Sequence, residues 1–524
     1  MKSGEPSSGA VLASSLTMRL WVGRLLRSRK LLIMAACSCP LSLLAQWTVQ
    51  PAVEARVTAA QKEVTSAGVP LRADIYSLLR PAIRIVGRGP NFDLSLNAAV
   101  ELVSYARGTQ PDRALPLLES GLKSVLVDRL VYFDANAAVR QTEVDVFAPS
   151  NESGSTFNRR STASYRLSPY LLREFSPRIS VLARHDESQT KQSGDDGTDL
   201  RSHYSVARLS GKPVPLGFLL EVSRLLSETR AATTSELRVI QAKAGVSVAL
   251  FDEVVLGVVA GSERTRLLLT DQDDGVYGVN LRWAPSPRTE LYGNLERRFF
   301  GNGGELRFNH RTPFTSLSIR ANREPVTATT SLGVIGAGGG DVSSVLDAIL
   351  SRSTPDPVQR AVLVQNLIST RGLQTSVPGA VDILAAYPQL QTGLTASWVY
   401  LGSRTTTSLS GLRQSLRQLT RNDAVVLVPV ADDSVQTSAA LEVSYRLDTQ
   451  TSVNSGLRWS HIRGLSITEG SNTRERSLRF ALVRSLDPRT EMTLGAQYKV
   501  VDNNKALVRH QTPSLAFVGM THRF

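Results

Sequence analysis

Residues Gly275–Asn322 form four consecutive segments in which apolar and polar side chains alternate at every second position. Alternation with a period of two is the pattern of a β-strand that has one apolar and one polar face. Each segment is about ten residues long, the length of a tilted strand that crosses a bilayer. Because an antiparallel sheet in water shows the same alternation, the extent of the pattern and the two ends of the chain must decide between these folds.

The alternation begins at Trp47 and continues, with long gaps, to Phe524. The connections between the expected strands alternate in length along the chain. Short turns are expected at Ser176–Arg178, Ser286–Arg288, Asp448–Thr449 and Asp487–Arg489. Longer polar loops are expected at 187–198, 263–274, 418–435, 463–474 and 502–510. Tight turns on one side and long loops on the other are typical of outer-membrane β-barrels.

The pattern predicts an all-β fold, a transmembrane antiparallel β-barrel over residues 46–524. We expect about 22 strands and accept about 16 to 22, because the pattern of residues 60–156 is ambiguous. In that region, Arg113–Leu122 can also be read as a short helix. An even number of strands places both ends of the barrel on the periplasmic side.

The composition suits a barrel with a wet interior. The 524 residues are 42% hydrophobic and only 6% aromatic, which is little material for several packed soluble cores. No apolar run reaches 18 residues, so the mature chain is not expected to contain a helical membrane span. Without residues 1–45, 54 of the 60 Lys and Arg and 45 of the 46 Asp and Glu remain. This basic surplus is spread evenly, which argues against nucleic acid as a partner and predicts an anion-favouring lumen.

Residues 1–45 have the pattern of a secretory signal peptide. A basic segment precedes the apolar run Leu31–Ala45, so we expect cleavage after Ala45. Residues 1–17 are polar, and translation can begin at Met1 or Met18. An uncleaved anchor and a lipoprotein signal ending at Cys37 are the alternatives. The second cysteine also lies in the signal, so the mature chain has no thiol for a disulfide, a metal site or a nucleophile.

Residues 323–391 interrupt the strand pattern with a partly helical insertion. Val342–Ser351 and Pro357–Thr370 have apolar residues at helical spacing, and Gly333–Gly340 is a flexible linker. The overlapping stretch Val334–Asp341 resembles a dinucleotide-binding loop, but no βαβ unit surrounds it. By strand parity the insertion leaves from the extracellular side. It is expected either to fold inward as a plug or to remain an extracellular loop.

The last strand ends in Phe524, with Ala516, Val518 and Met520 at alternate positions. This ending resembles the C-terminal signature of bacterial outer-membrane barrels. The resemblance implies the outer membrane of a Gram-negative bacterium, with its lipid as surroundings. It also implies that the barrel assembly machinery is a partner through this strand. His522 occupies a position that is usually aromatic or apolar.

The polar faces of the expected strands carry basic residues that are candidates for the lumen. They are Arg282, Arg298, Arg307, Arg311, Arg320, Arg458, Arg479 and Lys499. A basic ring selects anions in a pore. Alternatively, such residues pair with glutamates of neighbouring strands and stiffen the wall, which is the interpretation we prefer for any single residue.

The chain shows no pattern of a catalytic, cofactor-binding or metal site. Its six histidines are scattered and lack metal-ligand spacing. Ser460 and His461 are adjacent, so on a strand they face opposite sides and cannot form a dyad. We therefore expect a protein without cofactors that is not an enzyme.

Several phrases resemble one family, the PEP-CTERM system-associated outer-membrane proteins. They are Tyr165–Tyr170, Gly278–Thr289, Arg298–Gly301 with Leu306–Thr312, and Leu363–Leu367 in the insertion. The resemblance covers nearly the whole mature chain and concerns architecture. It implies an outer-membrane location and an association with exosortase and exopolysaccharide loci, but it implies no reaction.

The function predicted from these features is a transport pore or export conduit in the outer membrane, with a polysaccharide as a candidate cargo. The alternative is a closed barrel with a structural or assembly role, whose long loops contact surface polymer. A barrel enzyme is a third option, for which the sequence offers no polar triad. Channel conductance separates the first option from the second.

Overall fold

The structure is a computed structural model that describes residues 46–61, 73–143, 145, 147, 159–194, 197–230, 234–267, 270–326, 388–419, 433–465, 469–505 and 510–524. The predicted signal peptide and most of the predicted insertion lie outside these ranges. No α-helix occurs within them, so none of the described segments is a helical membrane span.

The described residues form one antiparallel β-sheet. Its strands are β1 (Gln46–Gln61), β2 (Asp74–Gly89), β3 (Phe92–Tyr105), β4 (Arg113–Val127), β5 (Val131–Glu143), β6 (Arg159–Glu174), β7 (Ile179–Gln192), β8 (Asp199–Gly211), β9 (Leu216–Arg230), β10 (Thr234–Phe251), β11 (Val254–Leu267), β12 (Thr270–Ser286), β13 (Thr289–Arg298), β14 (Gly301–Arg311), β15 (Thr315–Val326), β16 (Gln389–Leu401), β17 (Thr405–Gln418), β18 (Ser434–Arg446), β19 (Thr451–Gly464), β20 (Asn472–Ser485), β21 (Thr490–Asn503), β22 (His510–Gln511) and β23 (Ser514–Arg523).

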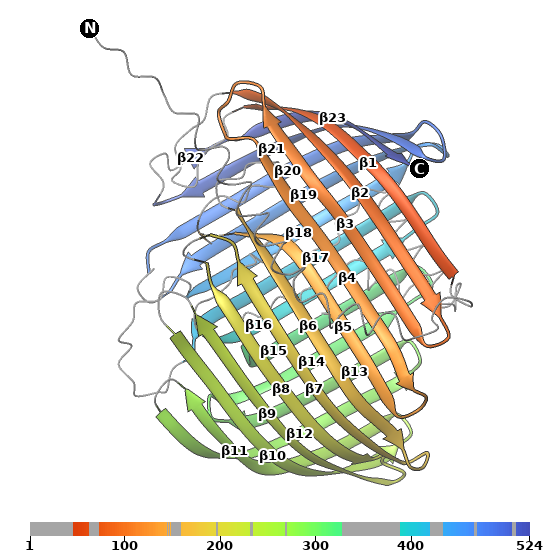
Figure 1. Ribbon diagram of the computed structural model, residues 1–524, viewed down its shortest axis with the longest axis vertical. Coiled ribbons are helices and arrows are strands. Elements are labelled where there is room, and N and C mark those ends of the chain that lie inside the picture. Colours follow the sequence, from red (N-terminus) through yellow and green to blue (C-terminus); the bar gives the residue numbers. More distant parts are fainter. Residues whose placement is uncertain are drawn as a thin grey trace, which may run out of the picture.

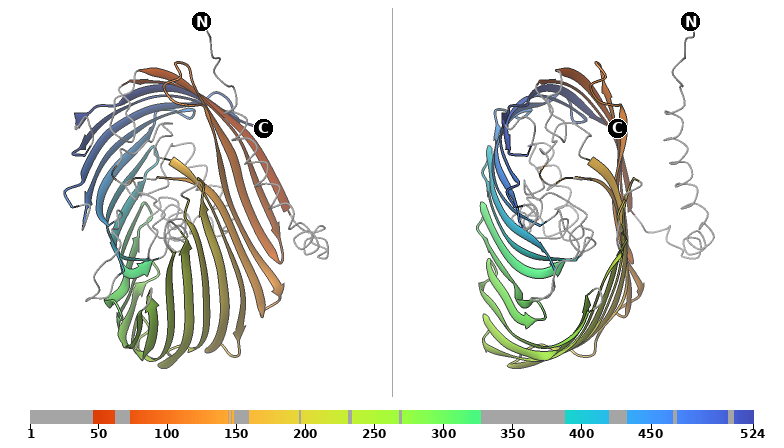
Figure 2. Two further views of the ribbon diagram at one scale, coloured as in Figure 1. Left: turned by 60° about the vertical axis from the view of Figure 1, so that its left-hand side comes forward. Right: turned by 90° about the vertical axis from the view of Figure 1, so that its left-hand side faces the viewer.

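The sheet closes on itself to form a barrel. Each strand from β1 to β21 pairs with the next along the chain, and β1 pairs with β23 from Ala52 opposite Arg523 to Gln61 opposite Ser514. The two-residue strand β22 and the last strand β23 both pair with β21, so they share one position in the wall. The barrel therefore has 22 strand positions. Figures 1 and 2 show the closed wall. The predicted antiparallel barrel and its strand number are confirmed.

Phe524, the last residue of the predicted C-terminal barrel signature, takes part in this closure. The backbone N–H of Phe524 donates a hydrogen bond to the carbonyl of Pro51 at 3.0 Å. Its ring contacts His522 edge-on, with ring centroids 4.7 Å apart. The last residue of the chain therefore continues the seam between the first and last strands beyond the end of β23.

Alternate residues of each strand face outward, and the outward residues are largely apolar. On β12, Tyr277 and Val279 are 64% and 54% exposed, whereas Val276, the neighbour of Tyr277, is fully buried. On β9, Leu220 and Val222 are exposed in the same way. Water solvates a continuous apolar band of this size poorly, so the outer surface is suited to lipid.

Aromatic side chains lie on both faces of the wall. Trp283, Tyr400, Trp459 and Tyr498 are exposed on the outer surface, and Trp398 stacks on Tyr400. Two other aromatic residues of Gly275–Asn322 do not lie on the outer surface. Tyr292 shares the inward face with Arg307, whose guanidinium lies 5.9 Å from its ring centre. Phe299 lies in the turn after β13 and contacts the buried cluster of Leu237, Val239 and Leu419.

The four predicted short turns all lie at one end of the barrel, where side chains cap the turning backbone. Asp487 accepts hydrogen bonds from the N–H groups of Arg489 and Thr490 at 2.7 and 2.9 Å. The Thr490 side chain and the Arg489 N–H hold the pKa of Asp487 below its ordinary value. A depressed pKa adds stability above the unfolded-state pKa, and that stability is lost as the pH falls through the folded-state pKa.

The opposite end carries the longer connections, but two of them are shorter than expected. The predicted loop 187–198 begins as strand, because β7 continues to Gln192. The predicted loop 263–274 is almost entirely strand in β11 and β12. Ion pairs across these two strands, Arg264–Asp273 at 2.7 Å and Arg266–Asp271 at 2.6 Å, account for polar residues in a strand.

The structure also corrects the helical alternative for Arg113–Leu122 and the bounds of the insertion at 323–391. Arg113–Leu122 belongs to strand β4, so the helical alternative is wrong for this segment. Its Leu115 and Leu117 share the inward face with Glu119, an alternation that the strand register requires. The ends of the predicted insertion are also strand, because β15 continues to Val326 and β16 begins at Gln389.

An outward charge should destabilise the barrel in lipid according to its depth. Val258 lies in mid-strand on β11, is 59% exposed and pairs with Val279. We expect Val258→Arg to lower the free energy of unfolding in lipid vesicles by about 2–4 kcal/mol, and Val254→Arg, at the first residue of β11, by about 0–1 kcal/mol. Urea titration followed by tryptophan fluorescence measures both. Equal effects of the two substitutions would contradict an outer surface in contact with lipid.

Candidate functional site

The candidate site is the inner wall of the barrel. The strand register places all eight predicted basic residues on the inward face. On β15, for example, Arg320 pairs with Arg307 of β14, while Ile319 and Ala321 on either side pair with outward residues. Inward charge and outward apolar side chains thus alternate along one strand, as a period of two requires.

Six of the eight predicted residues form ion pairs with glutamates of the same wall. The pairs are Arg282–Glu290 at 3.0 Å, Arg298–Glu263, Arg307–Glu305 at 2.6 Å, Arg320–Glu305 at 2.7 Å, Arg458–Glu442 at 3.5 Å and Lys499–Glu475 at 3.1 Å. Arg311 donates a hydrogen bond to the carbonyl of Pro287, and Arg479 lies over the ring of Phe517. Most of these basic residues therefore form ion pairs with glutamates on the same inner face.

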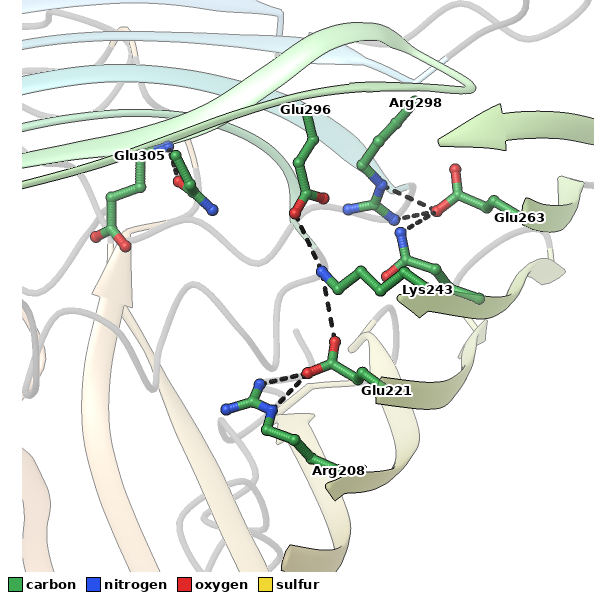
Figure 3. Close-up of polar contacts among 9 residues, drawn as sticks. Arg208, Glu221, Lys243, Glu263, Glu296, Arg298 and Glu305 are labelled. Atoms are coloured by element: carbon green, nitrogen blue, oxygen red, sulfur yellow. Dashed lines mark hydrogen bonds and ion pairs between the residues drawn. The ribbon is translucent and has the colours of Figure 1, made fainter. Parts of the chain in front are cut away.

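A longer charge network crosses β8 to β13. Arg208 Nε donates to Glu221 Oε2 at 2.6 Å, and Lys243 Nζ lies 3.4 Å from Glu221 Oε1. The same ammonium lies 3.1 Å from Glu296 Oε1. Figure 3 shows Lys243 bridging the two carboxylates. The network alternates in sign, so each carboxylate is neutralised by a neighbouring cation.

Lys243 reaches Glu296 because two glycines leave its path open. Lys243 lies on β10 and Glu296 on β13, and the two intervening strands carry Gly261 and Gly278 opposite them. A Cβ atom at Gly261 would lie 2.9 Å from Lys243 Cβ, and one at Gly278 would lie 2.7 Å from Glu296 Cγ. Any larger residue at either position would displace the side chains that form the bridge.

Glu263 forms a separate buried cluster beside this network. Its side chain is fully buried and accepts hydrogen bonds from the Arg298 guanidinium, including one from Nε at 2.9 Å. Gln241 Nε2 and the N–H of Phe299 also donate to it, at 3.4 and 3.3 Å. Removing one partner of a buried pair leaves the other charge without compensation and costs about 3–5 kcal/mol.

The opposite side of the barrel has a recess in its inner wall. The recess has a volume of about 310 Å³ and lies among β18–β21, β23 and β1. Phe517 lies at its centre, with the guanidinium carbons of Arg56 and Arg479 each 5.4 Å from the ring centre. Gly495 provides the space for the ring, since a Cβ there would lie 2.4 Å from Phe517. An aromatic face between two cations and nearby carboxylates suits a small polar ligand.

One residue between β5 and β6 lies against the far wall of the mouth. The carbonyl of Phe147 accepts hydrogen bonds from Thr473 Oγ1 at 2.7 Å and Asn503 Nδ2 at 2.9 Å. These donors belong to β20 and β21, several strands from β5 around the wall. Phe147 therefore lies at the mouth of the barrel at the long-loop end, against β20 and β21.

The histidines have structural partners. Thr289 bonds His310 and Thr490 bonds His522, both at 2.9 Å, so two Pro-Arg-Thr turns anchor the neighbouring strand in the same way. His461 bonds Asn472 at 2.8 Å. Among the described residues, no three His, Cys, Asp or Glu lie close enough to hold a metal ion.

The sequence did not indicate which inward residues would meet. Arg208, Glu221, Lys243 and Glu263 are not among the candidates. The first three lie on the polar faces of expected strands, so strand parity could have found them as inward residues. Glu263 begins the predicted loop 263–274, which the structure shows as strand. The bridge across two glycines depends on the register of four strands.

The burial of Glu263 predicts a large and specific effect of its removal. We expect Glu263→Ala to lower the free energy of unfolding by about 3–5 kcal/mol, because Arg298 loses its buried partner. Asp273→Ala on the neighbouring strand removes an ion pair whose side chains are 67% exposed, and should cost about 0–1 kcal/mol. Denaturant unfolding in vesicles compares the two. Similar losses would contradict a buried cluster at Glu263.

No family model matches the sequence, and no curated protein matches it. Its solved structural neighbours include the siderophore receptor PirA from Acinetobacter baumannii, with 8% identity and a TM-score of 0.47 over 91% of this chain and 80% of that chain. A mutant of the ferric enterobactin receptor PfeA from Pseudomonas aeruginosa has 9% identity and a TM-score of 0.45, over 91% of this chain and 80% of that chain. The FrpB iron transporter from Neisseria meningitidis has 9% identity and a TM-score of 0.47, over 91% of this chain and 81% of that chain. Likenesses this distant carry nothing about what this chain binds.

Proposed function

We propose that this chain is an outer-membrane barrel of a Gram-negative bacterium that forms a pore or export conduit. The observation that carries the proposal is a closed wall with an apolar outer face and a charged inner face. Within a membrane such a wall needs no partner for its backbone groups, because β1 and β23 leave no free edge. The conduit works through the polarity of its lumen and catalyses no reaction.

The inner wall suits a hydrated, polar cargo. Its charges are held in ion pairs, as in Lys243 between Glu221 and Glu296, so a passing molecule meets dipoles and few free charges. The recess at Phe517 adds an aromatic face with polar neighbours. These features are compatible with an uncharged or weakly anionic polysaccharide. Such a cargo agrees with the resemblance to PEP-CTERM system-associated proteins, which itself remains a prediction.

A second candidate function is a closed barrel with a structural or assembly role. The observation that favours it is the position of Phe147, held against β20 and β21 inside the mouth. A residue held inside the mouth by hydrogen bonds to the far wall narrows the passage. In that case the long loops contact surface polymer and the lumen conducts nothing.

Channel conductance decides between the two functions. The strand register allows clean deletions, because Val326 pairs with Gln389 and Glu143 pairs with Arg159. An Asn-Gly turn can therefore replace residues 327–388, residues 144–158, or both. We expect discrete single-channel currents in planar bilayers, larger in the variants that lack these segments. Absence of current from the wild type and from the double deletion would eliminate the pore and leave the structural barrel.

Ion selectivity tests the inner wall separately. The basic surplus predicts a preference for chloride, and the pairing of six of the eight basic candidates makes that preference modest. The reversal potential across a tenfold KCl gradient measures it in the open variants. A clear preference for potassium would show that the lumen is acidic in effect and would refute the predicted selectivity.

A further inference from the structure

The outer surface at the long-loop end differs between two sides of the barrel. On β8–β12, five outward arginines near this end are neutralised by carboxylates on the same face. These pairs are Arg201–Asp199 at 3.8 Å, Arg230–Glu228 at 3.9 Å, Arg238–Glu236 at 3.1 Å, Arg264–Asp273 at 2.7 Å and Arg266–Asp271 at 2.6 Å. This side therefore satisfies its own charges.

On β15–β20 the outward arginines at the same end are exposed, and none of them forms an ion pair with a carboxylate among the described residues. They are Arg323, Arg413, Arg417, Arg463, Arg474 and Arg476. Asp433 and Arg417 attract each other electrostatically, but the two side chains form no ion pair. In the part of the chain that the structure describes, this side consequently presents a basic surface with no matching acidic face.

Four of these arginines line a groove with a volume of about 1150 Å³, whose lining consists mainly of outward residues. We refer to Arg323, Arg413, Arg417 and Arg463 and the apolar residues between them as the arginine groove. Its small floor residues are Gly293, Gly304 and Ala321, and its apolar walls are Leu295, Leu306, Leu390, Leu394 and Leu465. Small residues at outward positions between leucines make the surface concave.

The register sets the spacing of the arginines. Arg323 on β15 and Arg463 on β19 lie in one row of paired residues that passes through Thr392, Ser415 and Val435. Arg413 and Arg417 lie to either side of that row on β17. With strands about 4.8 Å apart, Arg323 and Arg463 are about 19 Å apart along the wall. The cations thus form a broad frame that can hold more than one anionic group.

We propose that the arginine groove binds the phosphorylated, acylated glycolipid of the outer leaflet, that is, lipid A. The inference rests on the outer-membrane location proposed above. Guanidinium groups bind phosphate through paired hydrogen bonds, and exposed apolar grooves beside them accept acyl chains. A free phosphate has no use for the leucine walls, and a plain acyl chain has no use for four arginines. A lipid with several phosphates and several chains uses both.

The test is native mass spectrometry of the purified full chain in detergent, with bisphosphorylated lipid A as the probe. The groove variant carries Arg323→Gln, Arg413→Gln, Arg417→Gln and Arg463→Gln. A matched control carries Arg201→Gln, Arg230→Gln, Arg238→Gln and Arg266→Gln, which removes the same charge from the self-paired side. We expect the wild type and the control to retain lipid A and the groove variant to lose about tenfold or more in affinity.

The proposal would be overturned if the groove variant bound lipid A as tightly as the wild type does, or if the wild type bound dephosphorylated lipid A equally well. It would also be overturned if millimolar inorganic phosphate displaced lipid A from the wild type, or if phosphatidylglycerol bound as tightly as lipid A. Heat-dependent migration on gels verifies that each barrel is folded. If the fourfold variant does not fold, the double variants Arg323→Gln/Arg463→Gln and Arg413→Gln/Arg417→Gln replace it. Cell fractionation tests the location independently, so an error there is distinguishable from a groove that does not bind lipid A.

Discussion

The pairing of β1 with β23 is the interaction on which the rest of the structure depends. Ten consecutive residue pairs, from Ala52–Arg523 to Gln61–Ser514, join the two ends of the sheet. Without them, two long strands would present unpaired N–H and C=O groups, which lipid cannot satisfy. With them, every strand has two neighbours, and the difference between an inner and an outer surface becomes a property of the whole wall. The inward charges and the outward apolar band both follow from that closure.

The closed wall changes what a charged residue means. An inward Arg or Glu has partners on the adjoining strands at distances fixed by the register, as Arg298 and Glu263 show. Such pairs fix the inner surface and leave few charges free. An outward arginine on β15–β20 has no comparable partner among the described residues, so an anionic ligand can supply its counter-charge. The same residue type therefore stiffens the wall on one face and attracts ligands on the other.

The fold could be predicted from sequence because it depends on a local period. Alternation over Gly275–Asn322 repeats along the chain, and Pro-Arg-Thr turns mark one end of the barrel. Polar residues led to a wrong prediction of a loop at 263–274, where β11 and β12 are strands. Their exposed Arg and Asp side chains form ion pairs between the two strands. The prediction of loops there failed because pairing between strands, unlike period, is not visible in one segment.

The site was predictable only to the level of a face. Parity placed eight basic residues on the inner wall, but the bridge from Lys243 to Glu296 depends on glycines of two other strands. Likewise, the arginine groove gathers residues separated by as many as 140 positions, from Arg323 to Arg463. Such groupings follow from register around the barrel, which a single sequence does not contain.

The central claim is that neighbouring residues of one strand face opposite solvents. Since the predicted mature chain has no cysteine, Ser477→Cys and Leu478→Cys on β20 can each carry a single spin label in lipid vesicles. The inward face includes Ser477, whereas Leu478 is 48% exposed on the outer face. Relaxation by oxygen should dominate at 478 and relaxation by a water-soluble nickel complex at 477. Equal access of the nickel complex to both positions would contradict a closed wall between lipid and water.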